Sequence, residues 1–150
     1  MAYTIKINNL DRVVEEFKKA PKVINERLQI GVKNAGKTIL SIEKQEAPVG
    51  TGNLRRNIQF SYSPISSKVW PSSGYAVFVN EGTGLYGPRK DYIRPKRAKV
   101  LAFKKGGKMI FAKKVAGQKA NPFVERTRDK AEPKLNKIFD DMLKEITQKI

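Results

Sequence analysis

Apolar residues recur at helical spacing over the first third of the sequence, and this pattern restricts the fold most. Nine steps separate ten apolar positions, with a mean close to the 3.6-residue period of an α-helix. Proline 21 lacks an amide donor, so the pattern predicts a short helix over about 11–20 and a longer one over 21–46. Asn9 is the expected N-cap. The ten positions are Leu10, Val14, Phe17, Pro21, Ile24, Leu28, Val32, Ala35, Ile39 and Ile42.

Strand patterns occupy the middle of the chain. Residues 57–63 alternate polar and apolar side chains, and Val69–Trp70 is the expected return arm. Tyr75–Asn80 is short and mostly apolar, which predicts a central strand. Residues 99–115 form two runs around Gly106–Gly107, a pair that accepts the positive φ angles of a hairpin turn.

A second helix is predicted at the C-terminal end. Asn121-Pro122 is typical of a helix start, and Pro133 is a candidate interruption. The expected fold is therefore a single α+β domain over residues 1–150, in which an antiparallel β-sheet with a β-hairpin is flanked by a long N-terminal helix and a C-terminal helix. Its parts are helix over 11–46, sheet over 57–115 with a basic loop over 85–97, and helix over 122–149. The apolar stripe of the last helix is Leu135, Ile138, Phe139, Met142 and Ile146.

Composition excludes several kinds of chemistry. The chain has neither cysteine nor histidine, which removes disulfides, thiolate nucleophiles, Cys/His zinc sites and histidine general bases. We expect no cofactor and no metal. The N-terminal residues show no signal peptide, and the longest apolar run, Tyr75–Val79, is too short to cross a membrane.

Charge is the strongest compositional feature, because the formal net charge is +17. Twelve basic residues and one acid, Asp91, lie between Arg89 and Lys119. Such a surface attracts nucleic acid, an anionic membrane or an acidic protein. Neutralisation by neighbours in an assembly explains it equally well. Each helix mixes acids and bases on its polar face, so packing on the protein's own sheet explains the apolar stripes better than a membrane does.

Gly82, Gly84 and Gly87 follow the Tyr75–Asn80 segment with the spacing of a dinucleotide-binding fingerprint. That fingerprint must open a helix and be followed about 20 residues later by an acid. Proline 88 follows directly, and no acid lies between Asp91 and Glu125. The spacing therefore indicates a glycine loop, and the glycines are expected to act as a hinge for the basic loop.

A catalytic site has weak support. Glu81 and Asp91 are the only acids between Ala47 and Val124, and Glu81 is the better candidate for a functional acid. A ribonuclease-like site built from Arg, Lys and Tyr stays open as a distant alternative. Sequence-independent binding of nucleic acid by the lysine-rich hairpin is the nearer alternative. In either case Phe103 and Phe111 are interpreted as core or subunit-contact residues.

Four blocks in order resemble a known family. A long N-terminal helix is followed by "APVGTGNLRRNI", which is similar to A-P-x-x-T-G-x-L-R-x-S-I, and by "YAVFVNEGTG", which is similar to Y-A-x-x-V-E-x-G-T. A hairpin then leads into "NPFVERT". The order resembles the neck proteins of long-tailed bacteriophages, also called head–tail joining or tail-completion proteins. Asn57 replaces the usual serine, Glu81 is shifted by one place, and the basic loop is longer.

The resemblance implies a structural protein of the virion, without catalysis, that is assembled in the bacterial host cytoplasm. It implies a homo-oligomeric ring that contacts neighbouring connector and tail proteins, makes non-specific contact with packaged DNA and contacts no membrane. The expected subunit or partner contacts are Thr51, Leu54, Arg55, Arg56, Glu81, Tyr86, Arg89, Tyr92 and Arg94. The expected contacts with DNA or an acidic partner are Lys96, Arg97, Lys104, Lys105, Lys108, Lys113 and Lys114.

Overall fold

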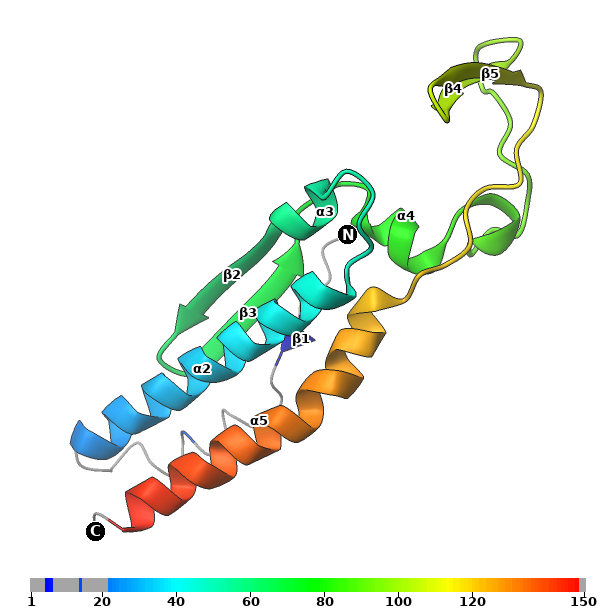
Figure 1. Cartoon of the computed structure of the whole chain (residues 1–150). Helices are drawn as coiled ribbons and strands as arrows, with labels where there is room; N and C mark the ends of the chain where they lie inside the picture. The colour runs from blue at the N-terminus through cyan, green and yellow to red at the C-terminus, as the bar shows by residue number, and fades with distance from the viewer. Residues whose placement is uncertain (1–4, 7–13, 15–21, 149–150) are drawn as a thin grey trace. The chain divides into compact units, whose positions relative to one another are not determined.

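The computed structural model describes residues 5–6, 14 and 22–148 (Figure 1). The predicted helix over 11–20 lies outside these residues apart from Val14. The chain divides into two compact units. The helix–sheet unit comprises residues 1–74 and 123–150, and the loop–hairpin unit comprises residues 75–122. The α+β class predicted from the sequence is confirmed.

The helix–sheet unit contains a three-stranded antiparallel sheet with strand order β1-β3-β2. The strands are β1 (Ile5–Lys6), β2 (Ile58–Ser63) and β3 (Ser66–Pro71). The register pairs Phe60 with Val69, which confirms the predicted return arm. The short helix α3 (Asn53–Arg56) leads into β2.

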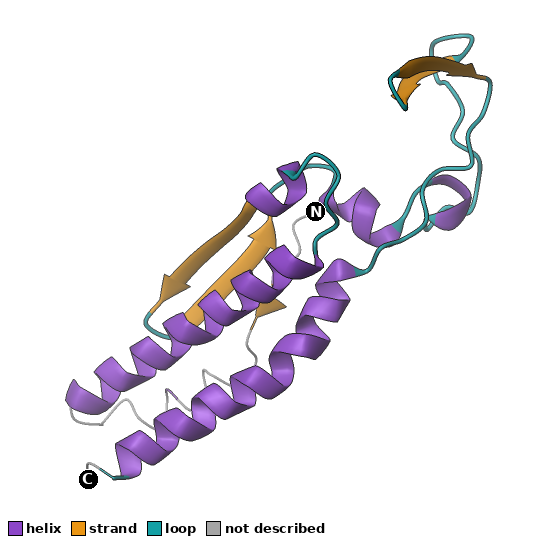
Figure 2. Ribbon diagram, viewed as in Figure 1, coloured by secondary structure: helices purple, strands orange, loops and turns teal. Residues whose placement is uncertain are grey.

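The predicted long helix is confirmed as α2 (Lys22–Glu46), which packs on β2 and β3 (Figure 2). Val32, Ile39 and Val69 are almost fully buried in this unit. The Ser67 hydroxyl donates a hydrogen bond of 2.7 Å to the Val32 carbonyl, which ties the helix to the sheet. A side chain at Gly36 would lie within 2.6 Å of atoms of Phe60 and Ser67, so this glycine allows close approach.

The C-terminal helix α5 (Phe123–Thr147) packs along α2 and runs through Pro133 without interruption. Pro133 is exposed, so water can solvate the carbonyl that proline leaves without an amide donor. Part of the predicted apolar stripe is confirmed: Met142 and Ile146 pack with Ile24 and Leu28 of α2, with Phe139 beside them.

Ion pairs add to the packing of α5 on α2. The Glu46 carboxylate accepts hydrogen bonds from Lys130 and, at 2.9 Å, from the Arg126 Nε. The hydrogen bonds from Lys130 and then Arg126 hold the pKa of Glu46 below its ordinary value. At the other end of the helix pair, Arg27 contacts Glu145 at 3.2 Å.

The predicted strand over Tyr75–Asn80 is wrong, because this segment forms the helix α4 (Ala76–Glu81). Its buried residues, Ala76 and Asn80, are four apart as on one helical face, while Phe78 is 58% exposed. The Val79 amide donates to the Tyr75 carbonyl at 3.1 Å. The preference of β-branched and aromatic residues for strands depends on how their side chains pack against neighbouring residues. In this segment the packing of Ala76 and Asn80 favours a helix.

The predicted hairpin is confirmed as β4 (Leu101–Lys105) and β5 (Lys108–Ala112), with Phe103 opposite Ile110. Gly106 and Gly107 have φ angles of 58° and 79°, as a primed two-residue turn requires. The hairpin is a sheet of its own. The range 57–115 is therefore not one sheet, because α4 and the basic loop separate the two strand pairs.

Candidate functional site

Two segments of the loop–hairpin unit, residues 82–87 and 115–121, are joined through their backbones. The Thr83 amide donates to the Gln118 carbonyl at 2.9 Å, and the Leu85 amide donates to the Ala116 carbonyl at 2.7 Å. The Gln118 amide returns a bond of 2.9 Å to the Thr83 hydroxyl. At several positions the two backbones approach so closely that they leave no room for a Cβ atom.

The glycines meet this requirement. A Cβ at Gly84 would lie 2.2 Å from the Ala116 carbonyl oxygen, and one at Gly117 would lie 2.2 Å from the Thr83 carbonyl oxygen. The amides of Tyr86 and Gly87 are also bonded within the turn. A phosphate would need such amides free, whereas four amides in residues 83–87 are already bonded to backbone carbonyls. The close packing also indicates that residues 82–87 and 115–121 are held rigidly together, where a hinge was expected. We call this pair of segments the locked junction.

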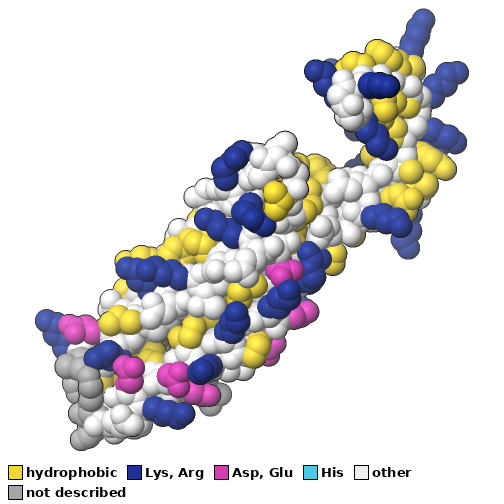
Figure 3. Space-filling model, in the orientation of Figure 1, with side chains coloured by type: hydrophobic (Ala, Val, Ile, Leu, Met, Phe, Trp, Pro, Cys, Tyr) yellow, Lys and Arg dark blue, Asp and Glu magenta, His cyan; other side chains and the backbone are white. Residues whose placement is uncertain are grey.

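Exposed positive charge is concentrated on the hairpin and on the basic loop before it. The lysines at positions 104, 105, 108 and 113 are exposed, and Figure 3 shows basic side chains around the hairpin with no acidic side chain among them. Within the described residues, no ion pair involves a hairpin lysine. Lys114 lies 4.3 Å from the centre of the Tyr92 ring. The predicted set of basic contacts is thus accessible to a partner.

The hairpin also exposes apolar side chains. Phe111 is 66% exposed, Met109 is 50% exposed and Phe103 is 36% exposed. The two phenylalanines are therefore not core residues of this chain. Their role as subunit contacts stays a prediction. A two-stranded hairpin is marginally stable by itself in water, so exposed apolar residues on both strands favour stabilisation by a partner.

A groove in the loop–hairpin unit brings several predicted site residues together. Its volume is about 730 Å³, and Glu81, Arg89, Tyr92, Arg94 and Lys96 all line it. Tyr86, also predicted, lies outside this lining and is 47% exposed. The sequence places these residues in one loop but contains no signal that the loop encloses a groove.

An internal ion pair fixes the loop beside this groove. The Arg94 guanidinium donates 3.0 Å bonds to both oxygens of the Asp91 carboxylate, and the Tyr92 amide donates to Asp91 at 2.7 Å. The hydrogen bond from Arg94, and then the one from the Tyr92 amide, lower the pKa of Asp91. Asp91 and Arg94 are thereby paired with each other within the loop.

The predicted contacts at residues 51–56 have different environments. Thr51 and Arg56 are exposed, and Arg56 donates to the Thr51 carbonyl at 3.4 Å. Leu54 is only 3% exposed, so it belongs to the core and not to a contact surface. Arg55 is half-buried, and its Nε has no hydrogen-bond partner among the described residues.

Sequence reasoning missed Glu43, the most unusual ionisable group of the helix–sheet unit. Its side chain is fully buried, and neither carboxylate oxygen has a hydrogen-bond partner in the described part of the chain. Burial raises its pKa from 4.5 to about 7. The sequence contains one sign of this burial, the position of Glu43 in the helical repeat. It lies four residues after the buried Ile39 and eleven after Val32, on the same helical face.

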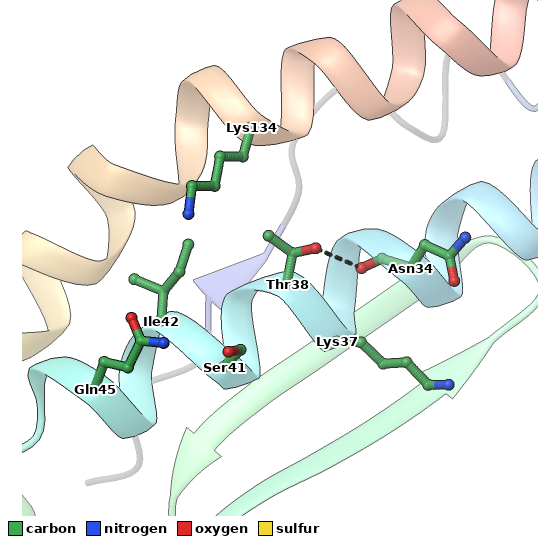
Figure 4. A pocket seen from close by; sticks show the side chains of 7 residues that line it. All are labelled: Asn34, Lys37, Thr38, Ser41, Ile42, Gln45 and Lys134. Carbon is green, nitrogen blue, oxygen red and sulfur yellow. Dashed lines mark hydrogen bonds between the residues drawn. The ribbon is translucent and has the colours of Figure 1, made fainter.

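A second, polar pocket of about 350 Å³ lies at α2 and α5. Figure 4 shows Lys134 of α5 extending toward Ile42 of α2, whereas Lys37 points away. The Thr38 hydroxyl donates within its own helix to the Asn34 carbonyl at 3.0 Å. With lysine as its only ionisable residue type, this pocket contains no acid–base pair.

No protein-family model, curated protein or solved structure gives a significant match to the chain. No group of three or more His, Cys, Asp or Glu side chains able to hold a metal occurs in residues 5–6, 14 and 22–148. Within the same ranges, no helix has the length and apolar character to cross a membrane.

Proposed function

We propose that this chain is a structural protein of a long-tailed phage virion that forms a homo-oligomeric ring in the neck and joins the DNA-filled head to the tail. The observation that carries the proposal is the hairpin, with exposed lysines and exposed apolar residues on one two-stranded element. Interface cores are rich in aromatic residues and methionine, and charges at the rim select the partner. The order of the four sequence blocks supports the same assignment.

The ring uses the hairpin as its main contact outside the helix–sheet unit. Met109 and Phe111 share one face of the hairpin and supply apolar area toward a neighbouring protein, while Phe103 lies on the opposite face. The lysines at the turn and strand ends face an acidic ring or the DNA that passes through the neck. Because a closed ring needs a heterologous interface, the hairpin of one subunit and its receiving surface on the next are different patches.

Charge reversal at the hairpin turn tests this role. The triple variant Lys104→Glu, Lys105→Glu, Lys108→Glu is expected to fold normally, because all three side chains are exposed. It is expected to lower the yield of joined, infectious particles by about tenfold or more, since opposite charges accelerate association by 10 to 10³. The yield is measured by plaque titre and by electron micrographs of heads and tails.

A matched control carries three reversals elsewhere: Lys37→Glu, Lys134→Glu and Lys137→Glu, all exposed on α2 and α5. This variant is expected to assemble normally. Normal joining with the hairpin variant, or an equal defect in both variants, contradicts the role proposed for the hairpin.

The same lysines favour a second candidate, sequence-independent binding of nucleic acid. A duplex binder neutralises phosphates, so its affinity falls steeply with salt. Titration of a labelled 20-base-pair duplex, followed by fluorescence anisotropy, separates the two candidates. Micromolar or tighter binding at about 150 mM salt, with a steep salt slope, favours the nucleic-acid binder over the structural ring protein.

A further inference from the structure

We propose that the groove of the loop–hairpin unit binds a segment of another protein that combines acidic and apolar side chains. This inference does not depend on the virion assignment, because it rests on the groove itself. The groove is apolar for much of its lining, including Val77, Phe78, Ile93 and Pro95. Its volume of about 730 Å³ suits a few side chains of a bound segment.

Exposed apolar side chains are concentrated at this groove. Phe78 is 58% exposed, Ile93 is 38% exposed and Tyr92 is 37% exposed, and all three line it. Single exposed apolar residues are ordinary, but a group of them around a concavity marks an interaction site. Phe78 is therefore the expected anchor, since buried aromatic residues contribute most to binding at protein interfaces.

The charge of the groove selects the chemistry of its occupant. Asp91 and Arg94 are paired with each other in its lining. The other charged groups that line it are two positive side chains, Arg89 and Lys96, and one carboxyl group, Glu81. The loop–hairpin unit as a whole has twelve basic and two acidic residues, a balance of +10. An acidic segment is therefore attracted to the groove.

The apolar lining favours a protein segment over a nucleic acid. Phosphate binding relies on donors around the ligand, and the nearby amides of Thr83 and Leu85 are already bonded to residues 116–118. Aliphatic and proline surfaces gain most from apolar side chains. Peptides with leucine or phenylalanine next to aspartate or glutamate combine both attractions.

The test uses the whole protein as bait for a displayed library of random 12-residue peptides. Enriched peptides are expected to carry at least two acids together with leucine or aromatic residues. The strongest is then labelled and titrated by fluorescence anisotropy. Phe78→Ser and Arg89→Glu are each expected to weaken binding by about tenfold or more, as for residues central to an interface.

Two controls match these substitutions outside the groove. Tyr62→Ser removes an aromatic side chain that is 52% exposed and Lys137→Glu reverses an exposed charge, both in the helix–sheet unit. Each is expected to change the affinity by less than about twofold, as for contacts outside the central cluster. Circular dichroism checks that all four variants fold. If the Phe78→Ser variant does not fold, the effect of Arg89→Glu on peptide affinity decides whether the inference holds.

Several outcomes overturn the inference. They are the absence of enriched peptides, enrichment without acids, and equal loss of binding in the groove variants and the control variants. A fourth is competition: if oligo(dT) displaces the peptide, and its own binding is lost with Phe78→Ser but not with Tyr62→Ser, the groove is a nucleic-acid site.

Discussion

Replacing Gly84 with alanine is expected to disrupt the loop–hairpin unit, whereas the same replacement at Gly106 is expected to be tolerated. Both glycines have positive φ angles, 61° and 58°, so both alanines carry the left-handed backbone penalty of about 1–2 kcal/mol. Only at Gly84 does the new Cβ meet backbone, at 2.2 Å from the Ala116 carbonyl oxygen. At Gly106 nothing lies within 4 Å.

The clash at Gly84 cannot be relieved by rotation of a side chain, because the opposing atom belongs to the backbone. The bond from the Leu85 amide to Ala116 must therefore open, and the expected total cost is about 4 kcal/mol or more. Hydrogen-exchange mass spectrometry of peptides covering residues 82–87 and 115–121 measures the loss of protection. Equal protection in the Gly84→Ala and Gly106→Ala variants contradicts the locked junction.

The stability of the helix–sheet unit is expected to fall as pH rises from about 5 to 7, because of Glu43. The pKa of this buried carboxyl is about 7 in the folded protein, above its ordinary value of 4.5. Between these values the folded state holds a proton that the unfolded state has released, so the free energy of unfolding decreases with pH. A difference of this size corresponds to about 3 kcal/mol.

Urea unfolding between pH 5 and 7.5 measures this dependence. The Glu43→Gln variant is expected to remove most of the slope and to exceed the wild type in stability above pH 7, since glutamine is neutral at every pH. Glu26→Gln, at an exposed position of the same helix, is the matched control and is expected to keep the wild-type slope. The lowered pKa values of Glu46 and Asp91 act only at more acidic pH, so they do not obscure the test. An identical slope in wild type and Glu43→Gln contradicts the prediction.

The two long helices and the hairpin were predictable from the sequence because their signals are local. In α2 and α5 the apolar side chains recur at the period of a helix, and the Gly106–Gly107 pair marks the hairpin turn. The candidate residues of the groove were predictable as a loop set, because arginine, lysine and tyrosine are concentrated between positions 86 and 97. Their arrangement around one concavity was not predictable.

Two residues show why the remaining features needed the tertiary structure. Phe78 occurs in a run of residues that favours a strand. In the structure the segment is a helix that buries Ala76 and Asn80 on one face and leaves Phe78 exposed. Glutamate is usually found at the protein surface, yet Glu43 lies on the face of α2 that is buried in the core of the helix–sheet unit. At Phe78 the surroundings outweigh the strand preference of the segment, which is worth at most about 1 kcal/mol per residue. At Glu43 the packing of the neighbouring apolar side chains outweighs the cost of burying a carboxyl group.

The sequence by itself determined the class of fold, the two long amphipathic helices, the glycine turn and the basic character of residues 89–119. Only the tertiary structure decided that the glycines at 82–87 pack against residues 115–121, that the basic loop encloses an apolar groove, and that a carboxyl group is buried at position 43. Periodicity and turn chemistry act between neighbours in the chain. Burial and close backbone approach depend on segments far apart in the chain, such as α2 and α5 or residues 82–87 and 115–121, which no local pattern encodes.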